Sequence, residues 1–583
     1  MNTATQLRSQ LASINRKSYP AYKSLKGSYD FQRYILHIEH VQGDPFASPS
    51  NIRVFVPHGK AKFPQEYYQT PCTRIALQDY LVRRMEKELS PHSFQAKGSG
   101  KSGILRITHC GQEVLDRTAC KIDGDGIHVR FEIGFPANGR TINAPELEKI
   151  LFSILPDCVF HALYWQNQKP ELVQRTIHLA EDQTFIRQEL SRLGLVAFVA
   201  DGAILPRQSG VSDLPMRNCI PFQSPSSLQV SLTLPHKGAI TGMGLPRGIT
   251  LFVGGGYHGK STLLQALEMG VYNHIQGDGR EYVITDSSAL KIRAEDGRHI
   301  QDVDISLFIN DLPNGKDTRH FTSLDASGST SQAANIVEGL YGHSRLFLID
   351  EDTSATNFMV RDEMMQTLIS RKKEPITPFL ERIREIYDHS GCSTILVAGS
   401  SGAFFHKADT VIQMDAYRPL DITASAKKLC EKYPLLPTEK SPYHQPEDKR
   451  QLSAATSSRQ SERNHRGSDR MKLKVLSKDA FSLNRETIDL RYVEQLADSE
   501  QTGALAQLLR YTLEQLADGR RTFPQICQQL QTLLDRKGLD GLFGSSLVPG
   551  NLAVPRIQEI RCCLNRYRGW KLSESQLADA SCL

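Results

Sequence analysis

The sequence lacks the features that mark secreted and membrane-embedded proteins. Its eleven cysteines include no Cys-x-x-Cys pair, and their scattered spacing is typical of reduced thiols. No run approaches the roughly 20 apolar residues needed to cross a bilayer. Residues 1–17 lack the apolar core of a signal peptide. We therefore expect a cytoplasmic protein with no membrane segment.

Charge of one sign is not in large excess either. The 70 basic and 64 acidic residues give a formal net charge of +6. That balance excludes a histone-like polycation but permits a local basic surface. Hydrophobic residues at 39% and charged residues at 23% indicate ordinary globular material.

The pattern along the 583 residues predicts four regions. Residues 1–225 mix helical and strand-like stretches, which favours an N-terminal α/β (α+β) domain. In residues 226–435, strands, glycine turns and helices alternate as in an α/β layer with a largely parallel sheet. Residues 436–475 form a polar linker, and residues 476–583 carry leucines at helical spacing, which predicts a helical C-terminal region. Individual predictions are strands over 52–56, 127–133 and 195–200, and helices over 145–155 and 181–193.

The strongest motif is GGGYHGKST at residues 254–262. It fits G-x-x-x-x-G-K-[ST], with an apolar strand before it (249–253) and a helix after it (261–267). Such a loop turns its N–H groups around phosphate oxygens beside a helix N-terminus. Lys260 adds positive charge at the β- and γ-phosphates, and the Ser261 hydroxyl is placed to bind Mg²⁺. The motif predicts ATP binding by Gly254, Gly255, Gly256, Tyr257, His258, Gly259, Lys260, Ser261 and Thr262.

A second glycine turn, GSGKSG at residues 98–103, does not complete this motif. The first glycine of the pattern would be residue 95, which is Gln95, and no apolar strand precedes the turn. We interpret it as a hairpin or basic surface loop.

Four apolar residues over 346–349, which predict a buried parallel strand, lead into two acids, Asp350 and Glu351. The C-terminal end of such a strand is where α/β sheets place their chemistry. Asp350 is the candidate Mg²⁺ ligand of a Walker B motif. Glu351 is the candidate general base for the attacking water. The alternative is a pair of exposed acids with no such role.

A serine-glycine turn precedes that strand by one helix. Ser327, Gly328 and Ser329 resemble the start of the LSGGQ signature of ABC ATPases, with Ser329 in place of the second glycine. A serine hydroxyl and the amides of a helix N-terminus form an anion site. The order of the three motifs therefore favours an ABC-type cassette over an unrelated loop.

Together these motifs resemble the bacterial family described as predicted ATPases of the ABC class. The resemblance rests on GGGYHGKSTLL, NHIQGDGRE, IRAEDGR, ASGSTSQAANI and LIDEDTSATNFMVRD, and covers most of residues 15–430. The family implies an N-terminal domain fused to an ABC-type cassette, while its physiological role is poorly defined. Related eukaryotic proteins are linked to mitochondrial RNA, which makes RNA a candidate partner by analogy.

Two elements of ABC proteins are missing from the sequence. The strand over 394–398 is followed by Gly399-Ser400-Ser401, with no switch histidine. Either Ser400 or Ser401 contacts the γ-phosphate instead, or hydrolysis is slow. The Q-loop glutamine is also absent, and Asn310 is the nearest polar candidate.

Three charged segments allow two interpretations each. Asp352, Thr353 and Asn357 resemble a D-loop that crosses a dimer interface, or they form a capped helix start. Residues 277–281 and 292–298 form an interface or regulatory loop, or they are solvated turns.

The motif set predicts a head-to-tail homodimer. ABC architecture places the P-loop and the signature of one cassette on opposite sides, so a second copy must close each site, in a two-fold arrangement. We expect an ABC-class ATPase that hydrolyses ATP with Mg²⁺ and couples it to conformational change on RNA or DNA, RNA being favoured. The alternative is an ATP-dependent switch on a protein assembly. A transporter motor is disfavoured, because no membrane span is present and the fused N-terminal domain is large.

The support for nucleic acid is the charge of the linker. Eight basic residues face four acidic ones there, and a flexible basic segment can follow phosphates. A plain solvated linker is the alternative. The basic residues are Lys449, Arg450, Arg459, Arg463, Arg466, Arg470, Lys472 and Lys474.

Overall fold

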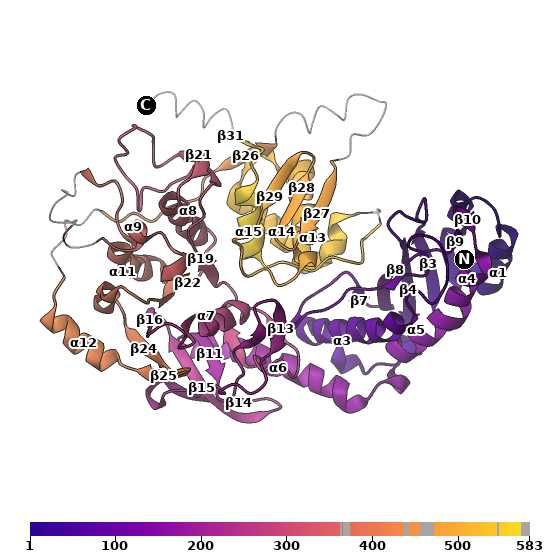
Figure 1. Ribbon diagram of the computed structural model, residues 1–583, viewed down its shortest axis with the longest axis horizontal. Coiled ribbons are helices and arrows are strands. Elements are labelled where there is room, and N and C mark those ends of the chain that lie inside the picture. The colour runs from indigo at the N-terminus through magenta and orange to yellow at the C-terminus, as the bar shows by residue number, and fades with distance from the viewer. Residues whose placement is uncertain (362–363, 365–372, 436–441, 455–470, 545–546, 573–583) are drawn as a thin grey trace. The chain divides into compact units, whose positions relative to one another are not determined.

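The computed structural model describes residues 1–361, 364, 373–435, 442–454, 471–544 and 547–572 (Figure 1). The chain divides into two compact units. Unit 1 is Met1–Thr184 with Lys537–Val554, and unit 2 is Phe185–Arg536 with Pro555–Leu583. No helix among the described residues is long and apolar enough to cross a membrane. The ten cysteines in the described part of the chain are free thiols.

Unit 1 is built on a seven-stranded sheet of order β1-β2-β3-β4-β8-β5, with β7 also paired to β8. Alternating burial along β4 shows one face turned to a core. The predicted strands over 52–56 and 127–133 and the helix over 145–155 are confirmed. The elements are β1 (Asn2–Thr3), α1 (Ala4–Ser13), β2 (Gly27–Asp30), β3 (Ile35–His40), β4 (Ser50–Pro57), α3 (Pro71–Leu89), β5 (Leu105–Arg106), β7 (Cys120–Ile122), β8 (Gly126–Ile133), α4 (Ala144–Lys149), a π-helical turn (Ile150–Ile154) and α5 (Leu155–Leu163).

A segment from near the C-terminus completes unit 1. Asp540 forms ion pairs with Arg130 at 3.0 Å and with Lys121 at 3.4 Å. The N–H of Val554 donates to the carbonyl of Asp116. The expected C-terminal region 476–583 therefore divides its contacts between the two units. The 98–103 turn also lies in unit 1, as a loop whose Ser99 N–H donates to Ala137.

Unit 2 contains the cassette, whose main sheet has the order β19-β22-β23-β16-β24-β25. All pairs are parallel except β24–β25. β22 and β23 are buried along their whole length, and each contains an apolar run, Leu346–Ile349 in β22 and Ile395–Val397 in β23. The elements are β16 (Ile249–Val253), α7 (Lys260–Met269), β19 (Leu290–Ile292), α8 (Gly328–Tyr341), β22 (Leu346–Asp350), α11 (Phe379–Ser390), β23 (Ser393–Val397), β24 (Thr410–Asp415) and β25 (Arg418–Asp421).

A second, antiparallel sheet of order β14-β15-β11-β18 belongs to the same unit. Its strands are β11 (Leu195–Ala200), β14 (Gln229–Leu234), β15 (Gly238–Pro246) and β18 (Val283–Thr285), and β11 lies over the predicted range 195–200. Because β11 pairs with both β15 and β18, the change of unit falls in α6 (Pro170–Arg192), earlier than the expected boundary at residue 225.

The C-terminal module, defined as residues 448–454, 471–536 and 555–572, contains the expected helices and also two three-stranded sheets. One sheet is β27-β28-β29, and the other is β30-β26-β31. The elements are β26 (Gln451–Ala454), β27 (Leu473–Ser477), β28 (Ala480–Leu483), β29 (Glu486–Asp489), α13 (Ser499–Tyr511), β30 (Asp518–Thr522), α14 (Phe523–Lys537), α15 (Ile557–Arg566) and β31 (Trp570–Leu572).

Part of the expected linker is folded into this module. Arg450 is only 5% exposed, pairs with Asp448 at 2.8 Å and lies over the ring of Phe523. Its interpretation as a free basic residue is wrong, because a buried ion pair and a ring contact fix it. Residues 436–441 and 455–470 lie outside the described residues, and with them Arg459, Arg463, Arg466 and Arg470.

Candidate nucleotide site

Three adjacent strands bring the candidate residues to one edge of the main sheet. β23 lies between β16 and β22, and all three run parallel. The phosphate loop follows β16, Glu351 follows β22, and Ser400 follows β23. Because parallel strands end at the same edge, residues from three separate parts of the sequence meet there.

Two glycines of the phosphate loop are required by its backbone. Gly254 has a φ of 139°, and a Cβ there would lie 2.5 Å from the carbonyl oxygen of Met414. Gly259 has a φ of 95° and directly precedes α7. Both positions lie in the left-handed region, where a side chain would be strained. The loop can therefore approach a ligand with its backbone, as a phosphate cradle requires.

The Lys260 side chain is hydrogen-bonded to the backbone of its own loop. Its Nζ donates to the carbonyl oxygens of Gly254 at 2.7 Å and Gly255 at 2.8 Å. No side chain caps the N-terminus of α7, so the amides of its first turn are available to an anion. Ser261 is exposed on that turn, and Thr262 is half-buried. At the tip of the loop, Tyr257 is fully exposed.

A hairpin turn that the sequence analysis did not identify lies against the loop. β24 and β25 are joined by Ala416 and Tyr417, both with positive φ, which is the form of a two-residue type I′ turn. The N–H of Ala416 donates to Nδ1 of His258 at 2.9 Å. Neither Ala nor Tyr signals such a turn, so no sequence pattern could have found it.

Asp350 has the surroundings expected of a metal ligand. It is 8% exposed at the end of β22 and accepts the N–H of Asp352 at 3.2 Å. Burial raises its pKa, while that N–H acts in the opposite direction. A nearby divalent cation would favour the ionised carboxylate. A carboxylate and the Ser261 hydroxyl are oxygen ligands of the kind Mg²⁺ prefers, so the two residues fit this ion.

Glu351 is held by the residues after β23. Its Oε2 accepts the N–H groups of Gly399 at 2.7 Å and Ser400 at 3.0 Å, and its Oε1 accepts the Ser400 hydroxyl at 2.6 Å. Burial alone would raise the pKa of Glu351, but these hydrogen bonds outweigh it and hold the pKa below its ordinary value. The side chain is therefore an ionised acceptor in a fixed orientation.

The serine-glycine turn begins α8 and is tied to the segment after Glu351. Ser327 directly precedes the helix, with its hydroxyl 3.1 Å from that of Thr330. Ser329 donates to Asn357 Oδ1 at 2.7 Å. Gln332 donates to the Ser354 hydroxyl at 2.9 Å. The candidate signature and the candidate D-loop thus form one hydrogen-bonded group.

Asn310 is not linked to the phosphate loop by any of its described hydrogen bonds. Its side chain donates to the carbonyl of Ser306, and its backbone N–H donates to the carbonyl of Pro375. Its proposed role as a replacement for the Q-loop glutamine stays a prediction without structural support.

The charged segments 277–281 and 292–298 are not wholly solvated turns, because several of their charged residues are buried and paired, whereas Asp296 is exposed. Asp278 is fully buried and pairs with Arg207 at 2.6 Å. Glu295 is 4% exposed and pairs with Arg566 of α15. The second segment therefore joins the cassette to the C-terminal module.

Family models match successive parts of the chain. Residues 4–166 match the model described as ATPase of the ABC class N-terminal, and residues 169–450 match the P-loop domain of the ABC ATPases. The chain belongs to the ATPases of the ABC class. The resemblance that the motifs suggested is confirmed, and the candidate nucleotide-site residues of this ABC-class ATPase fall within the P-loop match. Residues 472–573 match the MRB1590 C-terminal domain.

One curated relative is an uncharacterized protein of Methanocaldococcus jannaschii, MJ1628. It is 32% identical over 233 residues, which are 38% of this chain. The chain spans about half the length of that relative, 50%. Among solved structures, cbiO1 of Clostridium perfringens, part of the ABC transporter complex cbiONQ, is 13% identical with a TM-score of 0.25. The alignment covers 41% of this chain and 96% of that one. The ADP conformation of MJ1267, an ATP-binding cassette of an ABC transporter, is 9% identical with a TM-score of 0.25. That alignment covers 41% of this chain and 96% of MJ1267.

Proposed function

We propose that this ABC-class ATPase hydrolyses ATP at the edge formed by β16, β22 and β23. The observation that carries the proposal is the fixed Glu351 carboxylate, which lies at the same sheet edge as the phosphate loop. The loop amides and Lys260 bind the phosphate chain. Glu351 orients the attacking water and accepts its proton. Ser261 and Asp350 would hold Mg²⁺, which would neutralise charge on the phosphate oxygens.

The proposal includes a head-to-tail homodimer. Among the described residues, the side-chain hydrogen bonds of the phosphate loop go to the loop itself and to the β24–β25 turn, whereas those of Ser327 and Ser329 go to Thr330 and Asn357. In Figure 1, α7 and α8 lie on different parts of the cassette. Each signature is therefore free to meet the nucleotide of a second copy, in a two-fold arrangement.

The dimer is tested by sedimentation of Glu351→Gln with ATP. This variant keeps the shape of the site but removes the base, so ATP should hold two chains together. Adding Ser327→Arg should return the protein to monomer through steric and charge obstruction. A Glu351→Gln protein that stays monomeric at every ATP concentration would overturn the head-to-tail site. Mixing inactive Lys260→Ala and inactive Ser327→Arg chains should restore activity, because one site of each mixed dimer is intact.

We further propose that ATP turnover drives a conformational change on RNA, with DNA as the less favoured nucleic acid. The support is the remaining basic set, in which Lys449, Lys472 and Lys474 are exposed. Slow basal turnover is part of this proposal, since no switch histidine follows β23. The test is ATPase activity with RNA, single-stranded DNA and duplex DNA across a range of salt concentrations. Stimulation by none of the three would favour action on a protein assembly.

A further inference from the structure

An open cavity lies beside the candidate signature. Its volume is about 450 Å³, and it is bounded by the start of α8, the segment after Glu351, the segment after β19, and one residue of the C-terminal module. The lining residues that matter here are Gly328, Ser329, Asp352, Arg293, Asp296 and Tyr492. Tyr492 comes from a part of the sequence about 160 residues after the signature, so the C-terminal module reaches a site built by the cassette.

Tyr492 and Arg293 form a pair on one wall of this cavity. The Arg293 guanidinium lies 4.4 Å from the centre of the Tyr492 ring, and its Nη1 is 2.6 Å from Glu494. Stacking on an aromatic ring and pairing with a carboxylate both restrict the arginine to one orientation. The pair is therefore a preformed wall and not two mobile surface side chains.

Hydrogen bonds to the cassette hold the residues that follow Tyr492. Gln495 is 2% exposed, donates to the carbonyl of Glu268 at 3.1 Å and accepts the N–H of Lys291 at 2.9 Å. The hydroxyl of Tyr272 donates to the Gln495 carbonyl at 2.9 Å. These bonds set the position of Tyr492 relative to the signature.

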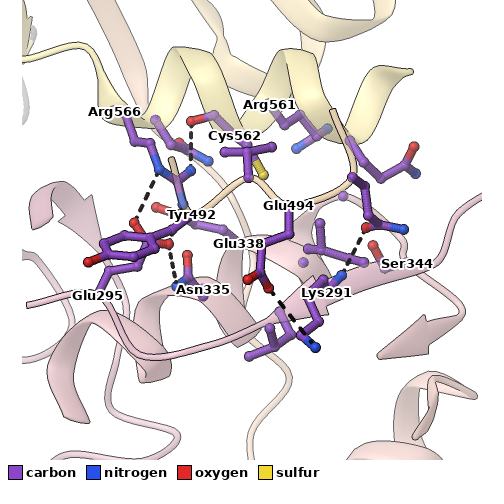
Figure 2. Close-up of a pocket in the computed structure, with 18 residues that line it drawn as sticks. Lys291, Glu295, Asn335, Glu338, Ser344, Tyr492, Glu494, Arg561, Cys562 and Arg566 are labelled. Atoms are coloured by element: carbon purple, nitrogen blue, oxygen red, sulfur yellow. Dashed lines mark hydrogen bonds and ion pairs between the residues drawn. The ribbon is translucent and has the colours of Figure 1, made fainter. Parts of the chain in front are cut away.

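The boundary between the module and the cassette is closely packed. Figure 2 shows Arg566 reaching Glu295 across it, beside Tyr492 and Glu494. The small enclosed cavity drawn there has a volume of about 20 Å³, which is room for roughly one water molecule. The 450 Å³ cavity is open and large enough to admit a larger ligand.

The chemistry of the lining fits a nucleotide. The N-terminus of α8 and Arg293 favour phosphate oxygens. The carboxylates of Asp296 and Asp352 line the same cavity, so it is not a simple anion site; they can accept hydrogen bonds from hydroxyl groups. A nucleoside triphosphate carries both an anionic phosphate chain and ribose hydroxyls. In the proposed head-to-tail arrangement, the nucleoside triphosphate bound by a second copy would lie at this cavity.

We propose that Tyr492 and Arg293 form part of the signature-side wall that closes over the ATP bound by a second copy of the chain, so that the C-terminal module contributes directly to the composite nucleotide site. This inference rests on the proposed head-to-tail dimer and names further residues that build its site.

The first test measures ATP-dependent dimerisation in the Glu351→Gln background. Tyr492→Ala and Arg293→Ala should each raise the ATP concentration for half-maximal dimer by about tenfold, as expected for loss of an interface anchor. Tyr492→Phe keeps the ring and should stay close to the parent. Tyr433→Ala, a control at an exposed tyrosine of unit 2 (69% exposed), should change nothing.

The outcomes separate this inference from the proposal beneath it. If Glu351→Gln itself does not dimerise, the proposed dimer fails. If it dimerises and both Tyr492→Ala and Arg293→Ala match it, only the assignment of these two residues is overturned. ATP binding by the single chain, measured in the dimer-blocked Ser327→Arg background, should be unaffected by Tyr492→Ala. Loss of that binding would place the effect within one chain and overturn the assignment.

A mixing experiment tests the trans role directly, with Glu351 intact. Lys260→Ala chains lack a working phosphate loop, and Tyr492→Ala chains lack the proposed wall. A mixed dimer pairs the intact loop of the second chain with the intact wall of the first, so ATPase activity should exceed that of either protein alone. If Tyr492 acted only within its own chain, no site would be intact and no activity would return.

Discussion

The hydroxyl of Ser400 donates a hydrogen bond to Oε1 of Glu351 at 2.6 Å. The serine that follows β23, where a switch histidine is missing, is thus directed at the candidate base. Two neighbouring N–H groups hold the other carboxylate oxygen. Ser400 is therefore a positioning residue for Glu351, and the proposed contact of Ser400 or Ser401 with the γ-phosphate stays a prediction.

Replacing Ser400 by alanine should lower kcat while leaving ATP affinity within about twofold. A hydrogen bond to a charged group contributes about 1.5–3 kcal/mol, which corresponds to roughly 10- to 100-fold in rate. Ser400→Thr keeps a hydroxyl, should retain most of the activity and is the matched control. Steady-state ATPase assays with separate nucleotide-binding measurements check this, and equal kcat for Ser400→Ala and wild type would contradict it.

Lys260→Ala should abolish ATP binding. The Nζ of Lys260 donates to the carbonyls of Gly254 and Gly255, so on ATP binding it must exchange these hydrogen bonds for bonds to phosphate oxygens. Among the described residues, no other lysine or arginine is hydrogen-bonded to the loop. Calorimetric titration with ATP is the measurement. Lys101→Ala, in the 98–103 loop of unit 1, is the matched control and should bind ATP normally. Near-wild-type affinity in Lys260→Ala would remove the phosphate-loop assignment.

Glu351→Gln should bind ATP and turn it over at least roughly 100-fold more slowly, the lower range for loss of a general base. The amide oxygen can accept the N–H groups of Gly399 and Ser400 while the amide NH2 donates to the Ser400 hydroxyl, so the loop should keep its shape. Turnover in single-turnover assays is the quantity to compare. Unchanged turnover would move the base elsewhere, with Asp352 the next carboxylate along the chain.

The Glu295–Arg566 pair should give unit 2 a pH-dependent stability. Burial raises the pKa of Glu295, but Arg566 and Arg298 outweigh it, so the folded pKa lies below the ordinary value of about 4.3. A carboxylate whose pKa is lower in the folded state stabilises the fold at pH values above its pKa in the unfolded state. That stabilisation is lost as pH falls through its pKa in the folded state.

Glu295→Gln should therefore destabilise unit 2 at pH 7, by about 3 kcal/mol for a broken buried pair. The difference in unfolding free energy between the variant and the wild type should become smaller as pH falls below about 4, toward and through the lowered pKa of Glu295 in the folded state. Thermal unfolding followed across pH is the measurement. Glu447→Gln breaks an exposed pair with Lys449 and should leave the melting temperature unchanged. If Glu295→Gln lowered the unfolding free energy by the same amount at every pH, the prediction would be wrong.

Deleting residues 455–470 should weaken binding of RNA and flatten its salt dependence, because Arg459, Arg463, Arg466 and Arg470 would no longer displace counterions. The deletion must begin after β26, since Arg450 and this strand are part of the fold. Titrations of labelled RNA at several salt concentrations measure both quantities. A deletion that changes neither would leave the linker without a role in nucleic-acid binding.

The sequence predicted the strands and the helix around the candidate nucleotide site well because its motifs are local. A glycine loop between a strand and a helix, or two acids after an apolar strand, carries its geometry within a few residues, and β16, α7 and β22 appeared where expected. The contact of Ser400 with Glu351 depends on β23 lying between two other strands, which no local pattern encodes. The same is true of Tyr492 beside Arg293, and of Arg450, whose polar neighbours in sequence suggested a solvated linker.

Gln495 connects two parts of the cassette that the sequence keeps apart, because it bonds to the P-loop helix α7 through Glu268 and to the edge strand β19 through Lys291. A residue that is hydrogen-bonded on both sides and 2% exposed cannot be released without leaving buried polar groups unpaired. The C-terminal module, α7 and β19 should therefore open to solvent together, as one cooperative unit in hydrogen exchange. An isolated cassette ending before residue 471 would lose that shared protection, so its behaviour in solution would not represent the cassette of the intact chain.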